Sequence, residues 1–139
     1  MRWLCVFPLL LPILAGCGGG PYNVAPVSGR ITLNGQPLAN ASVSFQPLAE
    51  GGKINPGPGS GGFTDSDGRY ALKLDGTDTR GAVIGKHMVR IDLTHQDNSA
   101  DDRPKRFKRL PARYNVKTKL EYDVPTRGTD SADFQLTAP

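Results

Sequence analysis

The stretch that decides the fold is VSGRITLNGQPLANASVSFQ, residues 27–46. Apolar and polar side chains alternate in residues 27–34 and again in residues 41–46. A period of two is typical of a β-strand with one face buried and the other in water. Asn34 and Gly35 lie between the two runs, and both residue types accept the positive φ of a tight hairpin turn. This stretch therefore predicts two half-buried strands and a turn.

The same alternation recurs through the rest of the chain, at residues 69–74, 89–94, 119–124 and 132–137. A shorter run at 62–64 is expected to pair with the strand at 69–74. Seven short strands in about a hundred residues predict an all-β fold, a seven-stranded antiparallel β-sandwich. The expected core consists of inward-facing members of these runs: Ile31, Leu33, Val43, Phe45, Tyr70, Leu72, Val89, Ile91, Leu120, Phe134 and Leu136.

Residues 1–16 are expected to be a lipoprotein signal peptide. Arg2 is followed by an apolar run at 3–15, which is too short to span a bilayer. The run ends in Leu14-Ala15-Gly16-Cys17, which resembles the lipobox of bacterial lipoproteins. That resemblance implies cleavage before Cys17 and lipidation of its thiol and new amine. Residues 17–26 would then be a lipidated cysteine and a flexible, glycine-rich tether.

Several acyl chains on one cysteine would anchor the protein firmly, since each buried CH₂ contributes about 0.8 kcal/mol and a single chain binds only marginally. The expected partner is therefore a membrane, and the expected location is the cell envelope, outside the cytoplasm. Gly18 follows the cysteine, where Asp resembles an inner-membrane retention signal. This favours the outer membrane over the inner one in a bacterium that has both.

The mature chain offers few groups for conventional catalysis. Cys5 lies in the signal and Cys17 at its end, so the folded domain has no cysteine for a thiol nucleophile, a disulfide or a zinc site. His87 and His95 would lie about 26 Å apart along one strand, too far to share a metal ion. His87 is instead expected to pack at the edge of the core. We expect no catalytic residue, no metal and no cofactor.

Three short motifs have two interpretations each. Asp65 and Asp67 match the start of a calcium loop, but a hairpin turn ending at Gly68 is favoured over a weak surface calcium site. Residues 57–62 match a dinucleotide-binding glycine pattern, but no helix follows, which favours a flexible loop. Residues 126–129 faintly resemble the end of the hydroxyisourate hydrolases, the enzymatic relatives of transthyretin, and are interpreted as a turn.

Positive charge is concentrated in residues 103–113, which hold six cations and no acid. The rest of the mature chain holds ten Lys and Arg against thirteen Asp and Glu. The favoured interpretation is a solvated loop beside its own acidic half, residues 97–102; the alternative is a surface for anionic lipid or acidic polysaccharide. Nucleic acid is not expected as a partner. The candidate contact residues are Arg103, Lys105, Arg106, Lys108, Arg109 and Arg113.

Residues 27–41 resemble the opening of carboxypeptidase-regulatory-like, or transthyretin-like, domains, with the pattern V-x-G-x-V-x-x-x-G-x-P-L-x-x-A. Residues 63–70 resemble the T-x-T-D-x-D-G-x-Y hairpin of that family, and residues 85–91 resemble a strand in which an aromatic is usual at the position of His87. Residues 110–115 are similar to a segment of small bacterial lipoproteins of this kind. The resemblance implies a transthyretin-like (prealbumin-like) β-sandwich over residues 27–138.

In this family the domain usually accompanies or displays another component and is not itself the enzyme. We therefore expect a non-enzymatic, lipid-anchored envelope protein that acts as a display or interaction module for an unknown envelope protein. The alternative is an accessory protein that binds anionic glycan or lipid through residues 103–113. A third, less favoured function is a hydrolase of the transthyretin-related type.

Overall fold

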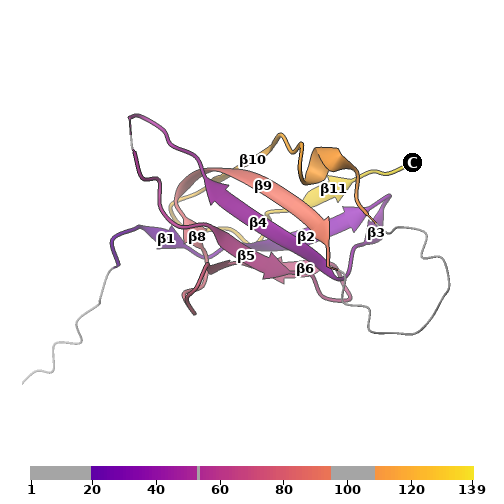
Figure 1. The fold of residues 1–139 in the computed structure, drawn as a ribbon. Helices are drawn as coiled ribbons and strands as arrows, with labels where there is room; N and C mark the ends of the chain where they lie inside the picture. The colour runs from indigo at the N-terminus through magenta and orange to yellow at the C-terminus, as the bar shows by residue number, and fades with distance from the viewer. Residues whose placement is uncertain (1–19, 53, 95–108) are drawn as a thin grey trace, which may run out of the picture.

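The computed structural model describes residues 20–52, 54–94 and 109–139, and within them the chain is all-β (Figure 1). The one helical element of these residues is a single 3₁₀ turn, η1 (Ala112–Tyr114). The strands are β1 (Val24–Ala25), β2 (Ser28–Leu33), β3 (Gln36–Pro37), β4 (Ala41–Pro47), β5 (Ser60–Phe63), β6 (Arg69–Ala71), β7 (Lys73–Leu74), β8 (Ala82–Val83), β9 (Gly85–Leu93), β10 (Leu120–Val124) and β11 (Phe134–Leu136). The all-β prediction is confirmed.

Two main sheets pack in a β-sandwich-like arrangement. The larger sheet has the order β10-β9-β4-β5-β7 and is antiparallel throughout. Its central pair, β4 and β9, runs in register from Ala41 opposite Leu93 to Pro47 opposite His87. The second sheet is built on β2, with β11 on one edge and β3 and β6 on the other. A separate two-stranded sheet joins β1 to β8.

The strand count differs from the prediction, because the structure has eleven strands in the described residues rather than seven. Three are two-residue additions, β1, β3 and β8. The fourth additional strand arises because the run at 69–74 divides at Leu72. Strand β6 pairs with β2, whereas β7 pairs with β5. At the division the Leu72 N–H donates to the Val27 carbonyl and the Leu72 carbonyl accepts from Gly81, so one strand changes sheet at this residue.

The expectation of a wholly antiparallel fold is also wrong, because β11 runs parallel to β2. Phe134 lies opposite Ile31 and Leu136 opposite Leu33. The approach is close: a Cβ on Gly29 would overlap the carbonyl of Ala132, so a residue without a side chain is required there. The register of this parallel pair therefore depends on Gly29.

The predicted core is largely correct. Nine of its eleven residues are buried, and Leu120 and Phe134 are half-buried because they lie on the edge strands β10 and β11. Phe45 lies at the centre of an aromatic cluster, with ring centroids 5.7 Å from His87 and 6.2 Å from Phe134. Since Phe134 belongs to the second sheet, this cluster joins the two layers.

Within the second sheet, Tyr70 on β6 holds the segment that precedes β11 with a buried hydrogen bond. Its hydroxyl donates to the Ala132 carbonyl at 2.6 Å. Burial, together with the fields of Tyr122 and Asp133, raises the pKa of Tyr70 well above its ordinary value, so this hydroxyl remains a donor.

The folded part begins earlier than residue 27. Val24 and Ala25 pair with Val83 and Ala82, and Ala25 is buried. Residues 24–26, expected in the tether, therefore belong to the folded domain.

Candidate functional site

Most of the residues singled out for function lie outside the described part of the chain: Cys17, Arg103, Lys105, Arg106 and Lys108. The structure does describe the last two cations of the basic run. Arg109 is exposed, next to the buried Leu110. Arg113 is also exposed, but its guanidinium is engaged by the rest of the domain.

The contacts of Arg113 are structural ones. Its Nη2 donates to the backbone carbonyl and to the side-chain Oγ1 of Thr137, and its guanidinium lies 4.8 Å from the ring centroid of Tyr114. The Tyr114 hydroxyl in turn accepts from the Thr137 N–H at 2.9 Å. These bonds attach η1 to the chain that follows β11. Arg113 therefore has a structural role, whereas the side chain of Arg109 faces solvent.

The Asp65 motif forms the hairpin turn that the sequence predicts. One carboxylate oxygen of Asp65 accepts the N–H groups of Asp67 at 2.9 Å and Arg69 at 3.0 Å. Gly68 takes a positive φ of 74° and donates back to the Asp65 carbonyl. Within residues 20–52, 54–94 and 109–139, no three His, Cys, Asp or Glu side chains gather as a group that could hold a metal ion.

The other two short motifs also form local backbone structure. The glycine pattern at 57–62 continues directly into strand β5 rather than into a helix. The segment at 126–129 contains a turn, closed by a hydrogen bond of 2.9 Å from the Gly128 N–H to the Pro125 carbonyl. The turn at 126–129 agrees with the favoured interpretation. The flexible loop expected at 57–62 is wrong for residues 60–62, because these belong to β5 and pair with residues 43–45 of β4.

His87 lies deeper than expected, since it is fully buried rather than at the core edge. Its Nδ1 is 2.9 Å from the Gly85 carbonyl, which makes Nδ1 the protonated nitrogen of the neutral ring. Nε2 is buried and has no hydrogen-bond partner. Burial lowers the pKa of His87, and the opposing effects of the Gly85 carbonyl and of Asp123 do not compensate. This imidazole is a neutral part of the core.

Ser60 is the second buried side chain that lacks a partner. It is fully buried at the start of β5, opposite Phe45 on β4, and its hydroxyl makes no hydrogen bond in the described structure. Ser60 and His87 are thus both enclosed. They lie opposite different residues of β4, Ser60 opposite Phe45 and His87 opposite Pro47.

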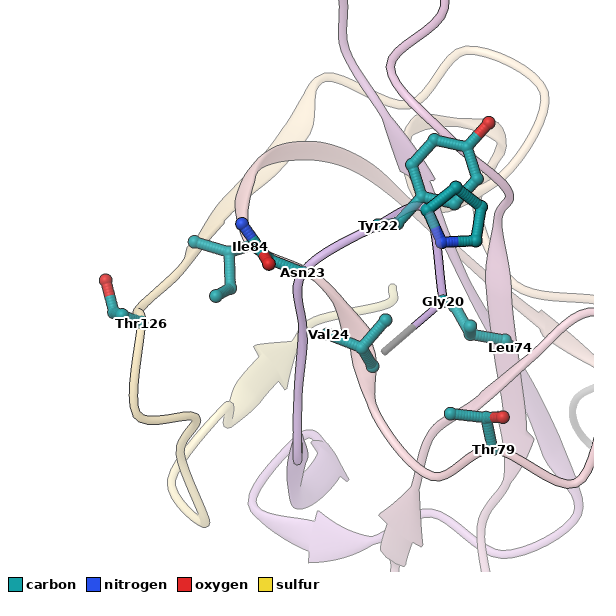
Figure 2. Close-up of a pocket in the computed structure, with 9 residues that line it drawn as sticks. Gly20, Tyr22, Asn23, Val24, Leu74, Thr79, Ile84 and Thr126 are labelled. Atoms are coloured by element: carbon teal, nitrogen blue, oxygen red, sulfur yellow. The ribbon is translucent and has the colours of Figure 1, made fainter. Parts of the chain in front are cut away.

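Two hollows of the described surface lie where the N-terminal segment meets the domain. One, of about 650 Å³, is lined by residues 20–24 together with Leu74, Thr79, Ile84 and Thr126 (Figure 2). A second, of about 430 Å³, shares Pro21, Tyr22 and Asn23 and extends to residues 47–50, 55–56 and 83–86. The N-terminal segment therefore lies between the two hollows.

This segment is bonded to the domain on both sides. The Ile84 N–H donates to the Asn23 carbonyl at 2.9 Å, and the Asn55 side-chain amide donates to the Tyr22 hydroxyl at 3.1 Å. We call this region the tether end; it comprises residues 20–25, β8, and residues 48–52 and 54–59. Sequence reasoning missed it, although Tyr22 and Val24-Ala25 form a short apolar group just before Pro26 that could have indicated it.

The basic run is attached at the opposite end, which we call the distal end (Figure 1). The segment that contains the first four cations of this run, residues 95–108, leaves the described structure after Thr94, which bonds to the Asn40 carbonyl through both its N–H and its hydroxyl. It returns at Arg109, beside η1. Strand β9 separates the two ends, with Gly85 near the tether end and Leu93 at the distal end, about 26 Å away.

No helix of the described residues is long and apolar enough to cross a membrane. Comparisons with models of known protein families, with curated proteins and with solved structures find no match.

Proposed function

We propose that this chain is a lipid-anchored protein of the bacterial cell envelope whose β-sandwich-like domain is a non-enzymatic display or interaction module. The observation that carries the proposal is the sequence Leu14-Ala15-Gly16-Cys17 at the end of an apolar run. The fold supports it, because the chain joins the domain at Tyr22, only five residues after Cys17. A lipid on Cys17 would hold the domain close to the membrane.

The non-enzymatic part of the proposal is supported by the state of the reactive side chains that the structure describes. His87 and Ser60 are enclosed in the core, and the Tyr70 hydroxyl is committed to the Ala132 carbonyl. A general base must lie within hydrogen-bond reach of its substrate. These buried groups do not lie within such reach of a molecule at the surface. These three side chains thus contribute to packing.

We further propose that the domain is of the transthyretin-like, carboxypeptidase-regulatory-like type. Its support is the all-β, two-layer architecture, together with the hairpin turn at Asp65 and the close approach that requires Gly29. Each of these features coincides with a residue that carries the resemblance. A domain of this type contributes a stable scaffold, and its function then lies in what its surface contacts.

Anchoring is tested by expression in a bacterium that is fed an alkyne-tagged fatty acid. The full-length chain should incorporate the label and sediment with the membranes. The matched Cys17→Ser chain should carry no label, because it lacks the acceptor thiol. Equal labelling of both chains, or recovery of the unchanged chain in the soluble fraction, would contradict the proposal. In a bacterium with two membranes, density separation assigns the label to one of them, and we expect the outer.

A second candidate function is the binding of an anionic polymer or lipid through the basic run. The observation that favours it is the separation of charge along the chain, with six cations and no acid in residues 103–113. Because both attachment points of the run lie at the distal end, an acidic polysaccharide beyond the membrane is the better partner. The test is binding of the soluble domain to an acidic polysaccharide at increasing salt, since exposed charges are screened beyond about 10 Å at 0.1 M. Salt-independent binding, or none, would leave the run as a solvated loop.

A further inference from the structure

We infer that the tether end is a membrane-docking surface, on which Ile54 contacts the phospholipid bilayer that holds the anchor. This inference rests on the proposed lipidation of Cys17 and adds an orientation to it. The domain would stand with its tether end on the bilayer and its distal end directed away. Three observations lead to this arrangement.

The first observation is the short reach of the tether. Tyr22 lies five residues after Cys17, and five fully extended residues span at most about 18 Å. The distal end lies about 26 Å from the tether end along β9. The domain therefore cannot invert and set its distal end on the bilayer while its lipid stays inserted.

The second observation is that the start of the domain is held rigidly. Residues 23–25 are attached to β8 by the Ile84–Asn23 hydrogen bond and by the pairing of Val24 with Val83 and Ala25 with Ala82. The ring of Tyr22 packs closely on Gly57, where an added Cβ would lie 3.0 Å from it. A short tether that ends in a fixed strand restricts which surface meets the bilayer.

The third observation is Ile54, whose side chain is 99% exposed. Its neighbour Asn55 bonds to the Tyr22 hydroxyl and also accepts the Gly57 N–H at 3.2 Å, so Ile54 is kept beside the tether. On the other side of the loop, Glu50 pairs with Lys86 at 3.4 Å, which fastens the loop to β9. An exposed β-branched apolar side chain in water gains by transfer to an apolar phase.

The bilayer is the occupant that this geometry favours, because the lipid on Cys17 brings it within the tether's reach of Ile54. Apolar side chains of peripheral anchors lie about 5–10 Å into the boundary between headgroups and acyl chains. The tether allows that depth at the tether end. At the distal end the exposed Val116, 76% accessible, follows η1 and lies beyond that reach.

The experiment uses the lipidated mature protein, from which the signal and Cys5 have been removed, in phosphatidylcholine–phosphatidylglycerol vesicles. One cysteine is introduced as Ile54→Cys or, as the matched control, Val116→Cys. The Cys17 thiol carries the lipid, so an environment-sensitive fluorophore reacts only at the introduced residue. Both positions are exposed, so neither substitution disturbs the core, which circular dichroism checks. Flotation measures anchoring, and lipids with a nitroxide high on the acyl chain measure contact.

We expect both proteins to float with the vesicles. The fluorophore at position 54 should show a blue-shifted emission and loss of fluorescence with the nitroxide lipid, whereas the fluorophore at position 116 should show neither. Flotation with an unquenched fluorophore at 54, or with equal quenching at both positions, overturns the inference and leaves the anchor intact. Failure to float overturns the anchor and, with it, the inference.

Discussion

Replacement of His87 by Phe should remove a pH dependence from the stability of the domain. The residue is fully buried, its Nδ1 donates to the Gly85 carbonyl, and its Nε2 has no partner. Protonation would place a charge and an unbonded N–H at Nε2, next to the ring of Phe45. Phe keeps a planar ring in the same aromatic cluster and cannot take a proton.

The sign follows from the direction of the pKa shift. Burial lowers the pKa of folded His87 below its ordinary value of 6.5, so the unfolded chain takes up the proton first as the pH falls. The stability that neutral His87 contributes is complete above pH 6.5 and is lost as the pH falls from there through the folded pKa. One proton gives a loss of at most about 1.4 kcal/mol per pH unit.

The assay is urea unfolding of the domain from Gly18 onward, without Cys17, between about pH 5 and pH 8. The quantity to follow is the unfolding free energy of the unchanged domain minus that of His87→Phe. The acidic residues and His95 are present in both proteins, so their titration cancels in this difference. The difference should be constant above pH 6.5 and fall below it. A difference that stays constant down to pH 5 would refute the placement of a neutral His87 in the core.

Three further substitutions, one of them with a matched control, test other parts of the structure. Tyr70→Phe leaves the buried Ala132 carbonyl without its donor, so it should lower the unfolding free energy by about 1.5 kcal/mol and the melting midpoint by about 5 °C. Gly29→Ala forces a Cβ against the Ala132 carbonyl and should cost about 2–3 kcal/mol, whereas Gly20→Ala, which meets no atom, should be silent. Arg113→Ser should lower the melting midpoint, because η1 loses the bonds from Arg113 to Thr137 and keeps only those of Tyr114, while polysaccharide binding stays unchanged. Equal effects of the two glycine substitutions, or an Arg113→Ser domain that melts normally but loses binding, would contradict these assignments.

The strands could be predicted because their signal is local. Each half-buried strand alternates apolar and polar residues, and the tight turns carry their own residues, as Asn34 and Gly35 do with positive φ values of 50° and 80°. Burial followed from the same alternation. The alternation overestimated the burial of only Leu120 and Phe134. The pattern within a strand does not show whether that strand lies at the edge of its sheet.

The parallel pairing of β11 with β2 could not be predicted, since it depends on how the chain crosses between sheets after Val124. The division of the run at Leu72 has the same origin, because the alternation continues through it while the pairing partner changes. Leu110 and Tyr114, both buried, lie outside any alternating run, in and beside η1. The hydroxyl of Tyr114 bonds to Thr137, which is distant in sequence, so no local pattern could indicate this contact.

The site was predicted less completely than the fold. The sequence indicates Cys17 and the basic run, but it does not show that they are attached at opposite ends of the domain. That separation depends on the direction of β9 between Gly85 and Leu93. The role of Tyr22 was also missed, because its partner Asn55 lies in a glycine- and proline-rich loop without a periodic pattern.

The central claim, a lipid anchor at Cys17, is tested most directly by mass spectrometry of the N-terminal peptide of the mature protein from bacterial membranes. The account predicts a peptide that begins at Cys17 and carries the added mass of a diacylglyceryl group on the thiol, with or without an acyl group on the amine. A peptide that begins at any other residue, or an unmodified Cys17, would contradict it.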